Sequence, residues 1–165
     1  MEHSLFVWWA AIDSGFALEP QWVAWADQQI LRLDAPPLWI LDLSLVHTVR
    51  EAQEVFGRSW ARMSVSLEKQ GWFDDLWMGF IYLRFERHRI DLLNLLLAAG
   101  GRADCSSFRI NCEAFYMMAN EIDGGGPTIA SDRPLGDRTV ELFAPMANLA
   151  RREWTTVWAG SESPP

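Results

Sequence analysis

The stretch that decides the fold covers residues 74–99 and reads DDLWMGFIYLRFERHRIDLLNLLLAA. Its first part, about residues 74–86, is apolar on almost every side of a helix, and so is its last part, about residues 89–99. Helices that are apolar all round lie at the centre of a protein. Asp74 and Asp75 suit the positive end of a helix dipole, where the first helix would begin. The stretch therefore predicts a buried hairpin of two helices around which the other helices pack.

The chain before this hairpin also has helical periodicity. Residues 4–13 form a short apolar segment, and Pro20 stands where the first turn of a helix accepts a proline. A short helix is expected over residues 37–45. One helix face of the segment after Pro20 would carry Trp22, Val23, Ala26, Ile30 and Leu33.

Residues 48–51, Thr-Val-Arg-Glu, match a capping box. In this motif the Thr and Glu side chains each satisfy an N–H group that the first turn of a helix leaves free. On the outer face of the helix that follows, Arg50–Glu54 and Glu54–Arg58 are spaced to form ion pairs. Its inner face would carry Val49, Ala52, Val55, Phe56, Trp60 and Met63.

The chain after the hairpin continues the helical pattern. One helix is expected over about residues 108–121. Another is expected to begin at Asp137, which would cap it, and to run to about Trp158, with a kink or a break at Pro145. A strand fits only around Met63–Leu67. The sequence predicts an all-α protein with a single domain over residues 1–160. This domain would be an irregular bundle of six to eight helices, with a buried central hairpin at about 74–99. A long loop is expected at 123–137 and a disordered tail over residues 161–165.

The charge balance excludes several classes of partner. The chain of 165 residues carries 14 basic and 22 acidic side chains, a net charge of −8. Proteins that bind nucleic acid or anionic membranes present a basic surface, so neither partner is expected. No apolar run approaches the roughly 18 residues that a membrane helix needs. The first residues lack the basic region of a signal peptide, so none is expected. A cytoplasmic location is expected because the two cysteines are predicted to be free thiols.

The metal-binding and thiol-bearing side chains show no functional spacing. None of the three histidines, His3, His47 and His88, has a second ligand at the spacing that places two ligands on one helix face. Cys105 and Cys112 could form one disulfide, but two free thiols are expected, with at least one packed in the core. The sequence therefore predicts no metal and no cofactor.

Basic side chains gather at one place, Arg84, Arg87, His88 and Arg89. Such a cluster can bind an anion, or it can pair with carboxylates of its own chain. The second interpretation is favoured, because the chain has a surplus of acidic residues that need partners.

The ten tryptophans and the acidic N-terminal part are the features that point to a function. Residues 1–48 hold six acidic side chains and one basic side chain, a net charge of −5. Within the close pairs Trp8-Trp9 and Trp22/Trp25, one ring of each is expected near the surface, because neighbouring residues point in different directions on a helix. An exposed aromatic ring with an acidic rim is typical of a protein interface. The alternative is that these rings join the N-terminal helices to the bundle. The predicted partner-binding residues are Trp8, Trp25, Asp13, Asp27, Asp34 and Asp42.

Residues 25–44 resemble a known group of proteins. The segments Trp25-Ala26-Asp27 through Ile30 and Asp34-Ala-Pro-Pro-Leu-Trp-Ile-Leu-Asp-Leu-Ser44 are similar to the N-terminal part of small all-helical bacterial proteins. Some of these are suspected to be immunity proteins of polymorphic or contact-dependent toxin systems. The resemblance implies a cytoplasmic antidote that binds a toxin and catalyses no reaction.

Three hypotheses follow. In the first, the protein is a cytoplasmic immunity protein that neutralises a cognate toxin, such as a basic nuclease, by occlusion through an acidic, aromatic-containing face. An acidic inhibitor would gain association rate by electrostatic steering. In the second, the protein is a small helical ligand-binding protein or enzyme with a pocket between helices near His88, Cys105 and Glu113. In the third, the tryptophan-rich face joins copies of the chain into a homo-oligomer.

Overall fold

Eight helices account for most of the residues that the computed structural model describes, namely 2–62, 66–106, 110–124, 126 and 133–158. The chain is an all-α bundle, as its periodicity predicts. No strand occurs among the described residues; of the predicted strand, residues 63–65 lie outside them and Leu67 begins a helix. In chain order the helices are α1 (Glu2–Asp13), α2 (Glu19–Arg32), α3 (Leu38–Leu43), α4 (Val49–Trp60), α5 (Leu67–Glu86), α6 (Leu92–Asp104), α7 (Cys112–Asp123) and α8 (Leu135–Trp158).

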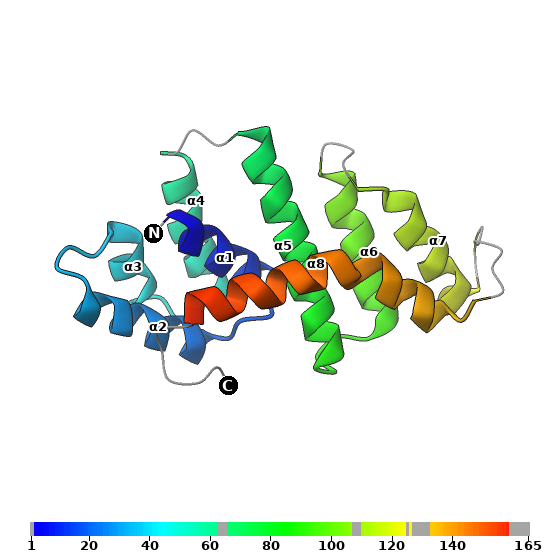
Figure 1. The fold of residues 1–165 in the computed structure, drawn as a ribbon, viewed down its shortest axis with the longest axis horizontal. Helices are drawn as coiled ribbons and strands as arrows, with labels where there is room; N and C mark the ends of the chain where they lie inside the picture. Colours follow the sequence, from blue (N-terminus) through cyan, green and yellow to red (C-terminus); the bar gives the residue numbers. More distant parts are fainter. Residues whose placement is uncertain (1, 63–65, 107–109, 125, 127–132, 159–165) are drawn as a thin grey trace.

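Helices α5 and α8 form the centre of the bundle. They cross in the middle of the molecule, with α1 to α4 on one side and α6 and α7 on the other (Figure 1). The crossing is close at Gly79 of α5, where an added Cβ atom would overlap the carbonyl oxygen of Met146 and lie 2.7 Å from the Cβ atom of Ala150. Glycine at this position therefore allows the two helices to approach each other. Buried residues of all eight helices belong to one hydrophobic cluster.

The predicted central hairpin is right for α5 and only partly right for α6. Ten residues of α5 are buried, which matches a helix that is apolar on every side. Helix α6 packs mainly against α7, and Leu97 on its outer side is 45% exposed. The predicted start of the first helix at Asp74 is wrong. Helix α5 begins at Leu67, where the hydroxyl of Ser66 accepts a hydrogen bond of 3.3 Å from the backbone N–H of Lys69.

Asp74 is consequently a buried residue inside α5 and does not cap its start. Its Oδ1 accepts hydrogen bonds from Nε and Nη2 of Arg102 in α6, at 2.9 and 2.6 Å. The same guanidinium lies over the rings of Phe73 and Trp77, 5.0 and 5.5 Å from their centroids. The ion pair thus joins α5 to α6 and neutralises a carboxylate that would otherwise be buried alone.

The predicted capping box of α4 is confirmed. The N–H of Glu51 donates to the Thr48 hydroxyl at 3.2 Å, and the Glu51 carboxylate accepts from the Thr48 N–H at 3.1 Å. Because the hydroxyl of Thr48 and backbone N–H groups donate to this exposed carboxylate, the pKa of Glu51 lies below its ordinary value. The Arg50–Glu54 ion pair is formed, whereas Arg58 pairs with Asp42 of α3 instead of Glu54.

The residues predicted for the inner face of α4 have different outcomes. Ala52, Val55 and Phe56 are buried as predicted. Val49 is 42% exposed, because it stands in the first turn, at the edge of the packed face. Met63 lies outside the described residues.

Helices α7 and α8 complete the bundle. Helix α7 begins later than predicted, at Cys112, where the side chain of Asn111 accepts from the N–H of Glu113. Helix α8 is not split at Pro145 but continues through it, and Pro145 is exposed, so water can reach the carbonyl that lacks an N–H partner. Asp137 lies in the first turn of α8 and is not its cap.

Two further predictions concern parts of the chain that are only partly described. Of the predicted loop at 123–137, residues 125 and 127–132 lie outside the described residues, whereas Asp123 ends α7 and residues 135–137 begin α8, so the connection is shorter than predicted. All of the predicted tail at 161–165 lies outside the described residues. None of the helices in the described part combines the length and the apolar character that crossing a membrane requires.

Candidate functional site

The two predicted aromatic anchors are core residues. Trp8 is fully buried, Trp25 is 2% exposed, and their ring centroids are 5.1 Å apart. Trp25 also stacks on Trp39 and donates its indole N–H to the carbonyl of Val157 at 3.3 Å, so it joins α2 to α3 and α8. The expectation that Trp8 or Trp25 is an exposed anchor at the surface is therefore wrong. Their rings join the N-terminal helices to the bundle, as the alternative interpretation proposed.

The reason for this error is the number of helices that surround α1. Adjacent residues of a helix do point in different directions, but α1 contacts α4, α5 and α8, which cover several sides of it. Of the pair Trp8-Trp9, the partly exposed ring is Trp9, which still packs against Trp60 with centroids 5.0 Å apart. In the second pair, Trp22 and Trp25 are both buried.

Asp13 and Asp42 are occupied by contacts within the molecule. Both oxygens of Asp13 accept hydrogen bonds, one from Nε1 of Trp77 at 2.9 Å and one from Nε2 of Gln53 at 2.6 Å. Asp42 forms its ion pair with Arg58 across 3.4 Å. These two carboxylates position helices, so they are less available to a partner than their sequence pattern suggested.

Asp27 and Asp34 are the predicted partner-binding residues that face solvent. Both are exposed, and neither has an ion-pair or hydrogen-bond partner among the residues that the structure describes. Asp27 lies on α2 and Asp34 in the connection from α2 to α3. The two carboxylates therefore leave a local negative charge at the end of the molecule where α2 and α3 lie (Figure 1).

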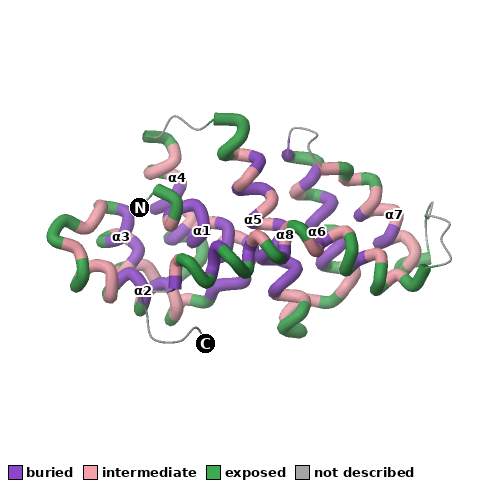
Figure 2. The backbone as a smooth tube through the Cα atoms, viewed as in Figure 1, coloured by how far each residue is buried: buried purple, intermediate pink, exposed green. Residues whose placement is uncertain are grey.

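Exposed leucines accompany these carboxylates. Leu31 on α2 is 87% exposed, and it follows Asp27 by one helical turn, so the two share a side of the helix. Leu38, Leu41 and Leu45 recur at the spacing of one helix face along α3 and the turn after it, and all three are exposed. We call these residues the α2–α3 surface: Asp27, Leu31, Asp34, Leu38, Leu41 and Leu45. Figure 2 shows exposed and half-buried residues along this end, in contrast to the buried interior of α1 and α5.

The leucines of this surface are not among the predicted partner-binding residues, because that prediction rested on aromatic anchors. A signal for them was present. On α3, Trp39, Ile40 and Leu43 occupy the buried side, which leaves Leu38 and Leu41 for the opposite side. A six-residue helix with apolar residues on both sides cannot bury all of them unless a second layer covers it.

The residues of the predicted interhelical pocket do not come together. His88 precedes α6, whereas Cys105 follows it and Glu113 stands at the start of α7. Since a helix rises about 1.5 Å per residue, α6 separates His88 from Cys105 by roughly 20 Å. The second hypothesis therefore loses its proposed site.

The two cysteines are free thiols, and neither is fully buried. Cys105 is exposed and Cys112 is half-buried at the start of α7. A hydrogen bond to Asp104 raises the pKa of the Cys112 thiol. Cys112 packs against the edge of the hydrophobic core, whereas Cys105 does not, so the prediction that at least one of the two thiols packs in the core is right in part. The described residues bring no group of three or more His, Cys, Asp or Glu side chains together as metal ligands.

The basic cluster contacts backbone carbonyls instead of carboxylates. Arg84 donates to the carbonyl of Ser14 at 3.2 Å, and Arg89 donates to the carbonyl of Phe16 at 3.1 Å. Arg87 lies 4.3 Å from the centroid of the Phe16 ring, and burial together with the nearby Arg89 lowers its pKa. The expected pairing with acidic side chains is therefore wrong. The cluster holds the turn between α1 and α2 against the end of α5.

Comparison with protein-family models, with curated proteins and with solved structures gave no match for this chain. The fold places it in the class of all-α helical bundles.

Proposed function

We propose that the protein is a binding protein whose α2–α3 surface docks on a partner with a basic, partly apolar surface, and that it acts as a cytoplasmic immunity protein against a bacterial toxin. The observation that carries the proposal is the combination of exposed leucines with two carboxylates, Asp27 and Asp34, that no described residue neutralises. An apolar patch with a polar rim marks an interaction site on a folded protein. Residues 25–44, which resemble suspected immunity proteins, form most of this surface.

The charge of the surface selects the class of partner. A basic partner gains from Asp27 and Asp34, whereas an acidic partner would be repelled by a chain of net charge −8. The leucines would supply the apolar contact at the centre of the interface, and the carboxylates would lie at its rim. A toxin with a basic active-site groove, such as a nuclease, fits these requirements.

The test is co-expression with the product of the adjacent gene. We expect a stable stoichiometric complex and relief of toxicity. The variant Asp27→Lys/Asp34→Lys should abolish rescue, and so should Leu38→Glu/Leu41→Glu. The matched control is Glu113→Lys/Asp123→Lys, which makes the same charge change at two exposed positions of α7 and should still rescue. A complex that forms with full affinity in both surface variants would refute the α2–α3 surface as the docking site, and absence of complex and rescue would refute the immunity function.

A further inference from the structure

We propose that a depression between the first turns of α1 and α5 binds a free α-amino acid with an apolar or aromatic side chain. This inference is independent of the proposed docking function, because it concerns a different part of the molecule. The depression has a volume of about 360 Å³ and is lined by Glu2, His3, Phe6, Lys69 and Trp72. Its volume lies within the range of small-molecule sites.

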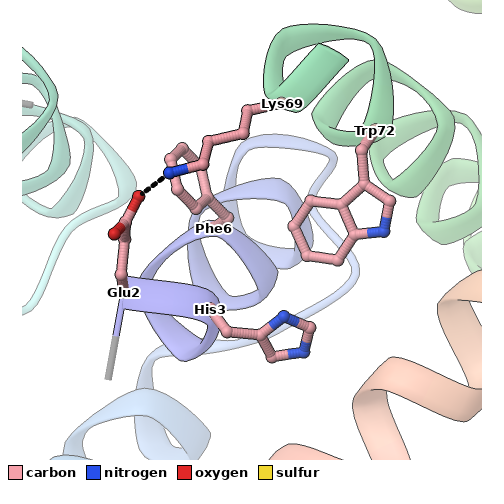
Figure 3. Close-up of a pocket in the computed structure, with 5 residues that line it drawn as sticks. All are labelled: Glu2, His3, Phe6, Lys69 and Trp72. Carbon is pink, nitrogen blue, oxygen red and sulfur yellow. Dashed lines mark hydrogen bonds and ion pairs between the residues drawn. The ribbon is translucent and has the colours of Figure 1, made fainter. Parts of the chain in front are cut away.

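The walls of the depression are aromatic. Figure 3 shows the rings of Phe6 and His3, from α1, and of Trp72, from α5, arranged around an open space. The Phe6 and Trp72 centroids are 6.3 Å apart with nearly perpendicular planes, and the His3 ring lies 5.0 Å from that of Trp72. An apolar or aromatic side chain entering this space would contact ring surfaces and displace water from them.

An ion pair closes one side of the depression. Nζ of Lys69 lies 2.5 Å from Oε1 of Glu2, and both side chains are about half exposed. Exposed pairs of this kind contribute little to stability, so a ligand can share these charges at small cost. Lys69 has three donor hydrogens and Glu2 has a second oxygen, so each can bind a ligand while the pair persists.

His3 adds a polar atom, Nδ1, that has no hydrogen-bond partner among the described residues. Its Nε2 lies 2.8 Å from Oε2 of Glu153, a buried side chain of α8 that also accepts hydrogen bonds from Arg152. A carboxylate only accepts, so Nε2 carries the hydrogen, and Nδ1 is an acceptor in the neutral ring. Figure 3 shows this other ring nitrogen on the side of the ring that faces Trp72 and the open space.

These groups match a zwitterion better than a ligand of a single charge. The ammonium group of an amino acid would donate to Glu2 and to Nδ1 of His3, and its carboxylate would accept from Lys69. The side chain would then lie against Phe6 and Trp72. A simple anion would meet the Glu2 carboxylate beside Lys69, and a simple cation would meet the Lys69 ammonium beside Glu2, so each would leave one charge repelled.

The test is calorimetric titration of the full chain with L-phenylalanine and L-leucine. We expect saturable binding of both. Two derivatives should each bind at least tenfold more weakly. N-acetyl-L-phenylalanine lacks the ammonium group, and L-phenylalaninamide lacks the carboxylate, as does the N-terminal residue of a peptide. Equal binding of the amide would show that the site takes a peptide N-terminus and would overturn the free amino acid as ligand.

Variants locate the site. Glu2→Gln and Lys69→Met should each weaken L-phenylalanine binding at least tenfold, whereas the control Glu68→Gln, at an exposed neighbouring position outside the depression, should not. Backbone amide shifts in NMR should change for residues of α1 and α5 on addition of ligand. No binding by the unmodified chain, or shifts confined to other helices, would overturn the proposal. The variant Asp27→Lys/Asp34→Lys should keep amino-acid binding, which separates a failure here from a failure of the docking surface.

Discussion

At the residue scale, the pair Asp74–Arg102 shows how one misplaced helix start changes the role of a side chain. Adjacent acids are typical of a first turn, but a buried acid inside a helix needs a cation, and Arg102 supplies it from α6. The side chain of Asp74 is 6% exposed and that of Arg102 is 24% exposed, so solvent screens this pair little. Removing Arg102 alone leaves the buried charge of Asp74 without compensation.

We therefore predict that Arg102→Met lowers the free energy of unfolding by about 3 kcal/mol, measured by urea denaturation. The double variant Asp74→Leu/Arg102→Met should recover most of this loss, because no charge is then left buried. Arg133→Met, at an exposed ion pair with Glu141, is the control and should change stability by less than about 1 kcal/mol. A loss at Arg102 no larger than the loss at Arg133 would contradict this account.

At the element scale, the contact of α5 with α8 depends on Gly79. A side chain at this position would meet the backbone of Met146, which cannot move without displacing α8. We predict that Gly79→Ala destabilises the protein by about 1–3 kcal/mol, the usual cost of overpacking. The matched variant is Gly101→Ala in α6, where an added Cβ atom has no neighbour within 4 Å.

In Gly101→Ala, the higher helix propensity of alanine should raise stability by up to about 1 kcal/mol. Thermal unfolding of both variants tests these two predictions. The melting temperature should fall in Gly79→Ala and rise in Gly101→Ala. A melting temperature of Gly79→Ala that is unchanged or raised would mean that Gly79 has no packing role.

The capping box gives a pH-dependent prediction for α4. Hydrogen bonds from Thr48 and from backbone N–H groups hold the pKa of Glu51 below its ordinary value of 4.5 in the folded protein. A carboxyl group with a lowered folded pKa stabilises the protein above its unfolded pKa, and this contribution is lost as pH falls through the folded pKa. Glu51→Gln should therefore melt below the unmodified protein at pH 7, and the difference should shrink once pH falls below 4.5. A constant difference across this range would contradict the role of the charge.

At the scale of the whole molecule, sequence periodicity predicted the fold class and most helices, and it failed where a property depends on neighbours. The capping box of α4 is local and was predicted to the residue. The burial of Trp8 and Trp25 was not predictable, because it depends on α3, α5 and α8 meeting around α1 and α2. The negative charge at Asp27 and Asp34 could be predicted, because it depends on the two residues alone. The hydrogen bond from Trp77 that occupies Asp13 could not be predicted, because it depends on how α1 packs against α5.

The remaining charge distribution leads to a kinetic prediction for the proposed complex. Rim charges act mainly on the association rate, through long-range attraction, whereas apolar contacts at the centre act mainly on the dissociation rate. Asp27→Asn/Asp34→Asn should therefore slow association and reduce its dependence on salt. Leu38→Ala/Leu41→Ala should leave association unchanged and speed dissociation. Surface plasmon resonance with the co-expressed partner at two salt concentrations measures both rates. If the leucine variant instead slowed association while dissociation stayed unchanged, the leucines would not lie at the centre of the interface.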